Sequence, residues 1–198
     1  MREAAKPALE KLDELGIKYY YYEHPLAKTM EDCEGIGADV GAKHFKNIYA
    51  CDHTETNFFI IIIRADKKFR TSEVSRKLGV SRLSFCTDEM LQENLGVVSG
   101  AVTPLALMND KEHKTLLVVD KDILRDEMVC CHPLTSDASV AMHRYDLIKF
   151  VRACGNEIKF LDIGETEQAA EYHRHGYKKS GLEPLFLSFT GFSSRKKH

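Results

Sequence analysis

The stretch Phe58-Phe59-Ile60-Ile61-Ile62-Ile63 decides the fold, because six consecutive large apolar residues are typical of a strand that is buried on both faces. We therefore place a strand over 57–64 at the centre of a β-sheet. A second strand is expected over 46–52, and the polar segment 53–56 between the two favours a tight turn. The pair is expected to be an antiparallel hairpin.

The remaining elements follow from hydrophobic spacing and from capping residues, glycines and prolines. Helices are expected at 3–15, 71–78, 87–95 and 146–153, with Thr71 and Thr87 as caps, and a short helix should begin at Thr29. Further strands are expected at 17–23, 83–86, 105–108, 115–119, 128–131, 139–143 and 157–162. Because strands and helices interleave without regular βαβ spacing, the sequence predicts an α+β fold with a mixed sheet.

The composition is typical of one globular domain. The 198 residues carry 28 Lys and Arg against 30 Asp and Glu, so a polyanion site must be a local patch. Neither a membrane helix nor a signal peptide is predicted, which favours a cytoplasmic protein. We expect one domain over 1–163 and a polar, basic tail over 164–198, in which 185–189 forms an edge strand or packs on the domain.

The six cysteines lie in apolar contexts without a C-x-x-C motif, which favours buried, reduced thiols. His173 and His175 have no third ligand nearby, so neither a metal site nor a cofactor is expected. The motifs of serine hydrolases and metalloproteases are absent from the sequence. A thiolate nucleophile beside His132 is disfavoured by its apolar neighbours.

Lys46 belongs to the first group of residues that could carry chemistry, Lys43-His44-Phe45-Lys46-Asn47 at the start of a strand. A lysine held by a sheet can reach a phosphate, although a solvated strand end shows the same residues. Basic residues further along the chain predict a patch that could follow a nucleic-acid backbone, although charge runs often mark only a solvated face. The patch consists of Lys67, Lys68, Arg70 and Arg76.

Two further groups are loops. Gly100-Ala101-Val102-Thr103-Pro104 combines a glycine, which lets the backbone approach a ligand, with a proline that fixes the exit of the loop. It does not match a phosphate-binding P-loop. In Cys131-His132-Pro133-Leu134-Thr135-Ser136-Asp137 a histidine leaves a strand before a polar turn. A site residue and a histidine that caps backbone groups are about equally compatible with this pattern.

Residues 3–163 resemble the YbaK-like family of aminoacyl-tRNA editing domains, particularly its free-standing, prolyl-tRNA synthetase-associated, PrdX-like branch. The matching segments are His24-Pro25 with Thr29-Met30-Glu31, Lys46-Asn47, Gly100 to Leu107 with Asn109-Asp110-Lys111, and His132-Pro133-Leu134. The resemblance implies a single α+β domain with a mixed, partly barrel-like sheet surrounded by helices.

The resemblance also implies hydrolysis of the ester between a wrong amino acid, typically alanine, and the tRNA for proline. Lys46 would hold the phosphate or ribose of the terminal adenosine, the Gly100 carbonyl would orient the attacking water, and His132 would line the pocket. An aminoacyl ester is already reactive, so a positioned water suffices without a nucleophilic residue. Other implied substrate contacts are Thr29, Met30, Asn47, Ala101, Val102, Thr103 and Pro104.

The implied partners are the acceptor end of the tRNA and prolyl-tRNA synthetase, with no membrane. A second hypothesis is a non-catalytic module that binds the tRNA or a synthetase through the same pocket without turnover. Presence of Lys46, Gly100 and His132 favours the enzyme.

Overall fold

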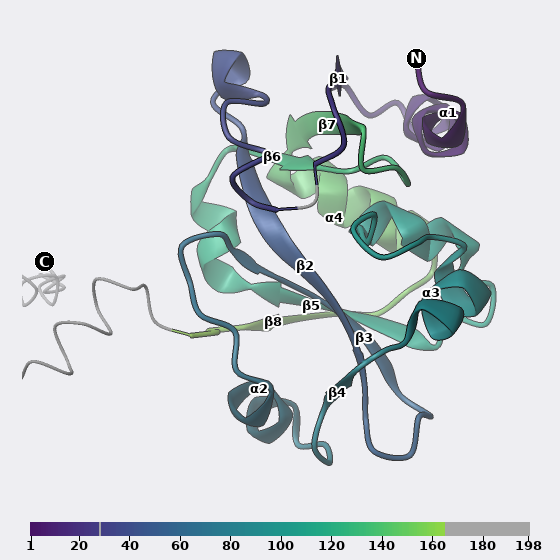
Figure 1. Ribbon diagram of the computed structural model, residues 1–198, viewed down its shortest axis with the longest axis vertical. Coiled ribbons are helices and arrows are strands. Elements are labelled where there is room, and N and C mark those ends of the chain that lie inside the picture. The colour runs from purple at the N-terminus through teal and green to yellow at the C-terminus, as the bar shows by residue number, and fades with distance from the viewer. Residues whose placement is uncertain (28, 165–198) are drawn as a thin grey trace, which may run out of the picture.

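A computed structural model describes residues 1–27 and 29–164, which form a single mixed sheet with helices on both faces (Figure 1). Its eight strands are β1 (Tyr19–Glu23), β2 (Lys43–Cys51), β3 (Phe58–Arg64), β4 (Ser84–Phe85), β5 (Thr115–Asp120), β6 (Met128–Cys131), β7 (Ala138–His143) and β8 (Ile158–Leu161). The α-helices are α1 (Lys6–Glu14), α2 (Thr71–Leu78), α3 (Asp88–Leu95) and α4 (Arg144–Ala153). Short 3-10 helices are η1 (Glu3–Ala5), η2 (Ala38–Val40), η3 (Pro104–Asn109) and η4 (Lys121–Arg125).

The central hairpin is confirmed, since β2 and β3 pair antiparallel over Phe45–Cys51 and Phe58–Arg64. Every residue from Phe58 to Ile63 is buried, as a strand covered on both faces requires. The sheet continues in the order β1-β7-β6-β2-β3-β5-β8, with parallel pairs at β2/β6, β3/β5 and β5/β8. The predicted α+β class and mixed sheet are thereby confirmed.

The two faces of the sheet carry separate hydrophobic cores. Alternate residues of β3, Ile60 and Ile62, pack with the residues of α1, α3, η3 and α4. Ile61 and Ile63 lie on the opposite face, where Val74 of α2 covers them. The period-two alternation of a strand explains how one apolar run serves both cores.

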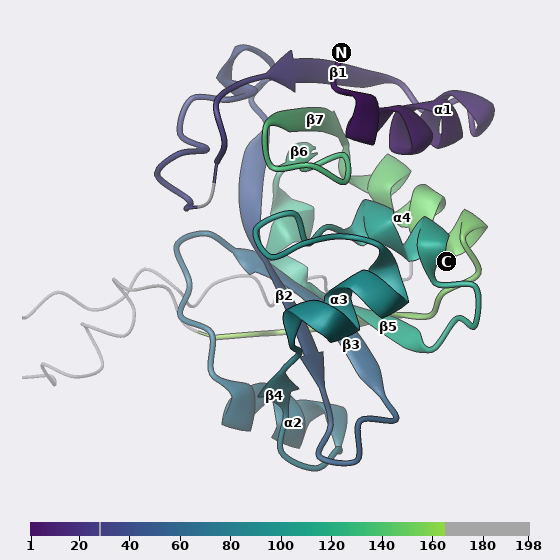
Figure 2. The same ribbon diagram turned by 45° about the vertical axis from the view of Figure 1, so that its right-hand side comes forward.

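Strand β2 has a gap along one edge. On the edge of β2 that faces away from β3, the first residues of β2, Lys43 and His44, pair with β6. Its last residues, Ala50 and Cys51, pair with β4. Just after β4, Cys86 N–H donates to the Tyr49 carbonyl at 3.1 Å, and neither β6 nor β4 pairs with residues 45–48, so the edge is open over 45–48 in the described part of the chain. Figure 2 shows β6 and β4 near opposite ends of β2, with α3 in front of the strand.

Three local expectations were wrong. Residues 105–108 form the 3-10 helix η3, because Pro104 starts a helical turn and Thr103 Oγ1 caps it by accepting from Leu105 N–H at 3.3 Å. A short buried apolar run does not by its spacing distinguish strand from helix. Thr71 is not the cap of α2, because it already lies inside the helix and Arg70 occupies the cap position.

The segment after Thr29 forms successive turns instead of a helix, although capping-type hydrogen bonds are present. Thr29 N–H donates to Asp32 Oδ2 at 3.0 Å, and Asp32 N–H donates to Thr29 Oγ1 at 3.2 Å. Gly35 and Gly37 follow with φ of +84° and +75°, which end a right-handed helix. The expected element at 185–189 lies outside the described residues. Among those described, no helix has the length and apolar character to span a membrane.

Candidate functional site

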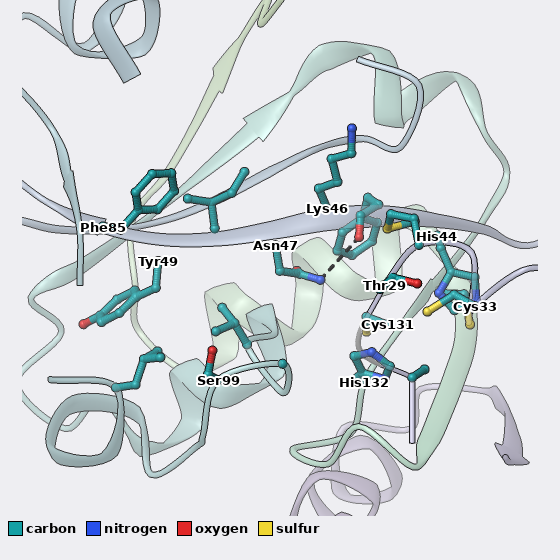
Figure 3. A pocket seen from close by; sticks show the side chains of 18 of the residues that line it. Thr29, Cys33, His44, Lys46, Asn47, Tyr49, Phe85, Ser99, Cys131 and His132 are labelled. Atoms are coloured by element: carbon teal, nitrogen blue, oxygen red, sulfur yellow. Dashed lines mark hydrogen bonds between the residues drawn. The ribbon is translucent and has the colours of Figure 1, made fainter. Parts of the chain in front are cut away.

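A cavity of about 370 Å³ lies at the open edge of β2. Its walls come from β2, the loop after α3, the end of β6, Ala27 and the turns that follow Thr29 (Figure 3). Segments that the sequence singled out separately are therefore brought together. Lys46, Gly100 and His132 all contribute to the lining, as do Thr29, Met30, Asn47 and Val102.

The Gly100 loop is fixed at both ends. Gly96 ends α3 with φ +64°, and Asn109 Nδ2 of η3 donates to the Leu95 carbonyl at 2.7 Å. Gly100 itself has φ +87°, a conformation that favours glycine, and the next N–H, of Ala101, donates to Val98 O at 3.0 Å. The loop therefore presents its backbone to the cavity in a defined conformation.

Ala101, Thr103 and Pro104 are three of the residues that the resemblance places in contact with the substrate. All three are buried, and none lines the cavity. Thr103 and Pro104 instead begin η3, which packs beneath the loop. Their role in the structure is to hold Gly100 and Val102 in place.

His132 follows β6 directly and is 8% exposed. Its Nδ1 lies 2.9 Å from the Ala138 carbonyl, so this nitrogen donates and, in the neutral ring, Nε2 carries the lone pair. Burial lowers the pKa of His132, although the Ala138 carbonyl opposes that shift, so the ring is neutral at neutral pH. The side chain can therefore accept a hydrogen bond from a bound water or ligand.

The turn that carries His132 is braced by the His24-Pro25 segment. Ala27 N–H donates to the Ser136 carbonyl at 2.7 Å, and His24 N–H donates to the Asp137 carbonyl at 3.2 Å. The ring of His24 also lies 2.9 Å through Nε2 from Ser139 Oγ, and its centroid is 6.1 Å from that of His132. This gives the His-Pro pair a structural function that the sequence did not reveal.

Asn47 and Lys46 point to opposite faces of β2 (Figure 3). Asn47 lies on the side of Ser99 and His132, where its Nδ2 donates to Phe45 O at 3.4 Å. Its Oδ1 is buried and has no hydrogen-bond partner within residues 1–27 and 29–164. Lys46 lies on the other side and donates from Nζ to the Lys67 carbonyl at 2.7 Å. The cavity thus extends around the open edge of the strand.

Sequence reasoning missed several wall residues because no motif marks them. His44 lies deep in the wall and donates from Nε2 to the Ile36 carbonyl at 3.2 Å, and burial lowers its pKa to about 4. Ser99 and Phe85 also line the cavity. Strand alternation from Asn47 could have found Tyr49, which lies on the same face of β2.

In the predicted basic patch, Lys67 is 4% exposed and paired with Asp120 Oδ2 at 2.9 Å and Asp122 Oδ2 at 2.7 Å. Burial opposes the charge of Lys67, but the hydrogen bonds that Lys67 donates to both carboxylates outweigh it and raise the lysine pKa. A buried ion pair is unavailable to phosphate. The other patch residues, Lys68, Arg70 and Arg76, are exposed and surround a hollow at α2.

The cysteines near the site are protonated thiols. Burial raises the pKa of Cys131 to about 12 and also raises that of Cys130. A thiolate nucleophile is therefore disfavoured here. Within the described residues, no cluster of three or more His, Cys, Asp and Glu side chains is arranged for a metal ion.

Comparison with known families matches residues 24–150 to the aminoacyl-tRNA editing domain. The chain belongs to this family. Among curated relatives, the editing-domain chain is 30% identical over 161 residues to the prolyl-tRNA editing protein ProX of Acetoanaerobium sticklandii, a match that covers 81% of this chain and 98% of ProX. It is 31% identical over 144 residues to prolyl-tRNA synthetase associated domain-containing protein 1 of Danio rerio, covering 72% and 78% of the two chains.

A solved structure described as that of a proposed trans-editing enzyme for prolyl-tRNA synthetase has the same fold. Its TM-score is 0.63 at 18% identity, and the match covers 83% of this chain and 99% of the other. The family resemblance that the sequence motifs indicated is thereby confirmed, together with the editing-domain fold.

Proposed function

We propose that this editing-domain protein is a trans-editing hydrolase that removes a small, wrongly attached amino acid, above all alanine, from the tRNA for proline. The observation that carries the proposal is the cavity, which both Gly100 and the neutral His132 line. The similarity to the prolyl-tRNA editing protein ProX over nearly the whole of that relative supports the substrate class.

In the proposed reaction a water attacks the ester carbonyl, the carbon–oxygen bond to the ribose breaks, and the free amino acid and tRNA leave. The Gly100 carbonyl accepts a hydrogen bond from the attacking water, and His132 Nε2 lines the acyl end of the cavity. Asn47 Oδ1, which is buried without a partner among the described residues, can accept a hydrogen bond from the α-ammonium group. The ester is reactive enough that positioning supplies the catalysis, without a metal ion or cofactor.

Lys46 completes the proposed site from the other face of β2. Its ammonium group is held by one backbone carbonyl, of Lys67, and a phosphate is a stronger partner because the hydrogen bond then joins opposite charges. We assign the domain to residues 1–163 and a tail to 164–198. The acceptor end of the tRNA is the proposed partner, and prolyl-tRNA synthetase is the enzyme whose errors would be corrected.

The test is a deacylation panel on the full chain. Alanyl-, cysteinyl-, seryl- and prolyl-tRNA for proline are incubated with the protein, with and without a chelator, and alanyl-tRNA for alanine serves as the control for tRNA choice. We expect alanyl-tRNA for proline to be hydrolysed fastest and the chelator to have no effect. Faster hydrolysis of the cysteinyl or seryl ester would overturn the assignment of alanine, and inhibition by the chelator would overturn metal independence.

A non-catalytic binding module is the second candidate function, because the same cavity walls would hold the acceptor end of the tRNA without turnover. It predicts that the chain binds the tRNA for proline and leaves every ester on the panel intact. Turnover of any of these esters by wild-type protein, lost in His132→Ala or Gly100→Ala, excludes it.

A further inference from the structure

The face of β2 that carries Lys46 presents a row of three side chains along the cavity. Lys46 and Ile48 are alternate residues of β2, about 7 Å apart along the strand. Phe85 of β4 lies opposite Ala50, the next residue on that face. All three side chains of the row line the cavity, and Figure 3 shows Lys46 and Phe85 on the same side of the strand.

Phe85 is unusual for an aromatic residue at a strand position, because 65% of it is exposed. Phe69 packs behind it, with ring centroids 6.1 Å apart and ring planes at 58°, a tilted arrangement that supports aromatic pairs. Phe69 therefore supports the Phe85 ring, and the exposed area of Phe85 is open to the cavity mouth.

We propose that Phe85 is the stacking platform for the terminal base of the tRNA 3′ end. The inference rests on the proposed function and deepens it, because it assigns the nucleotide a binding direction. A nucleotide that lies along the row has its base on Phe85, its sugar over Ile48 and its phosphate at Lys46. The acyl group, which is attached to the sugar, then extends around the open edge of β2 to Asn47 and the Gly100 loop.

The chemistry of the row favours a single-stranded nucleotide over a protein segment. Unpaired RNA bases are bound by stacking on aromatic side chains, and a cation beside the ring binds the backbone. The unpaired edge of β2 is only a few residues long, between β6 and β4, which leaves little room for an added peptide strand. The tilted Phe69 supports the Phe85 ring, most of which stays exposed, as a stacking platform requires.

Stacking is tested directly with uncharged tRNA for proline that carries 2-aminopurine at its terminal position, because stacking quenches 2-aminopurine fluorescence. Wild-type protein should quench the signal. Phe85→Ala should remove the quench and weaken binding roughly 5- to 150-fold, the range measured for single base–aromatic contacts. Phe85→Tyr should retain the quench, whereas Phe85→Leu should lose it although it keeps apolar bulk.

The matched control is Tyr145→Ala, which removes another exposed aromatic ring, from α4, that does not line the cavity. It should leave the quench and binding unchanged, and melting curves verify that all variants are folded. Equal quench in wild type and Phe85→Ala overturns the proposal, as does full retention in Phe85→Leu. A change in oligomeric mass with an unchanged quench identifies Phe85 as a contact between copies and also overturns it.

Deacylation separates this inference from the proposed function. If the wild type quenches 2-aminopurine through Phe85 but hydrolyses no mischarged tRNA, the stacking platform stands and the hydrolase proposal fails. If the wild type hydrolyses alanyl-tRNA for proline and Phe85→Ala leaves both KM and the quench unchanged, the hydrolase stands and the platform fails.

Discussion

The two faces of β2 differ in how firmly their side chains are held. On the face of Asn47, the Gly100 loop is fastened by Asn109 and η3, and the His132 turn is hydrogen-bonded to the 24–27 segment. On the face of Lys46, the lysine donates to the backbone carbonyl of Lys67, and Phe85 is mostly exposed.

This difference matches what the two faces are proposed to do. Hydrolysis needs groups held in position before the substrate arrives, because small displacements at a reacting centre are costly. Binding a flexible 3′ end needs accessible surfaces of matching chemistry. Substitutions on the face of Asn47 should therefore change kcat, whereas substitutions on the face of Lys46 should change KM.

The largest expected effect is that of Gly100→Ala, which should lower kcat about 100-fold. The new Cβ would meet no atom within 4 Å, so steric crowding is not the cause. The backbone, at φ +87°, would instead shift to relieve a strain of about 1–2 kcal/mol and misplace the carbonyl. Single-turnover deacylation and melting curves measure the two effects.

Gly79→Ala is the matched control for backbone strain. Gly79 ends α2 with φ +76°, its Cβ would also meet no atom within 4 Å, and it does not line the cavity. It should lose similar stability and keep kcat. If both variants lose activity equally, general destabilisation explains the result and Gly100 has no special function.

Lys46→Ala should raise KM about tenfold and change kcat less, because one hydrogen bond to a charged group is lost. Stability should fall by about 1 kcal/mol through loss of the bond to the Lys67 carbonyl. Lys43→Ala, an exposed lysine of the same strand, is the control and should leave KM unchanged. A loss confined to kcat would mean that Lys46 acts at the reacting centre. The proposed difference between the two faces of β2 would then be wrong.

How much the sequence could predict also differs between the faces. Gly100 and His132 could be proposed from the sequence because a glycine in a loop and a histidine at a strand end leave a local pattern, and on the other face the same holds for Lys46 alone. Phe85 left none, since β4 has only two residues and its exposure depends on how it pairs with β2. The burial of Lys67 was not predictable either, because its partners Asp120 and Asp122 are more than 50 positions away in the chain.

The pH dependence of stability should report the two histidines that line the cavity, His44 and His132. The folded-state pKa of His44 is lowered to about 4 and that of His132 is also lowered, so the unfolded chain binds more protons below about 6.5. Their contribution is fully present above that value and declines as the pH falls toward the folded pKa. The loss is at most about 1.4 kcal/mol per pH unit for each histidine, and less for the half-buried His44.

Denaturant unfolding between pH 7 and 5 measures this slope, since carboxylates titrate mainly below that window. His44→Gln should flatten the slope while keeping a side-chain donor for the Ile36 carbonyl. An unchanged slope in this variant would show that His44 is protonated in the folded protein as easily as in the unfolded chain.

The smallest expected effects belong to the surface around α2, beyond either face of β2. Replacing Lys68, Arg70 and Arg76 with alanine should lower the magnitude of the log–log salt slope of tRNA binding by roughly 0.7 to 0.9 for each phosphate contact removed. Lys77→Ala is the control from the same hollow, because Lys77 is already paired with Glu73 at 2.6 Å. If the triple variant keeps the wild-type slope, the tRNA does not cross α2 and its contacts are confined to the cavity and its mouth. If Lys77→Ala alters the slope as much as the loss of one patch residue does, the Lys77–Glu73 ion pair opens when tRNA binds. The patch then extends along α2.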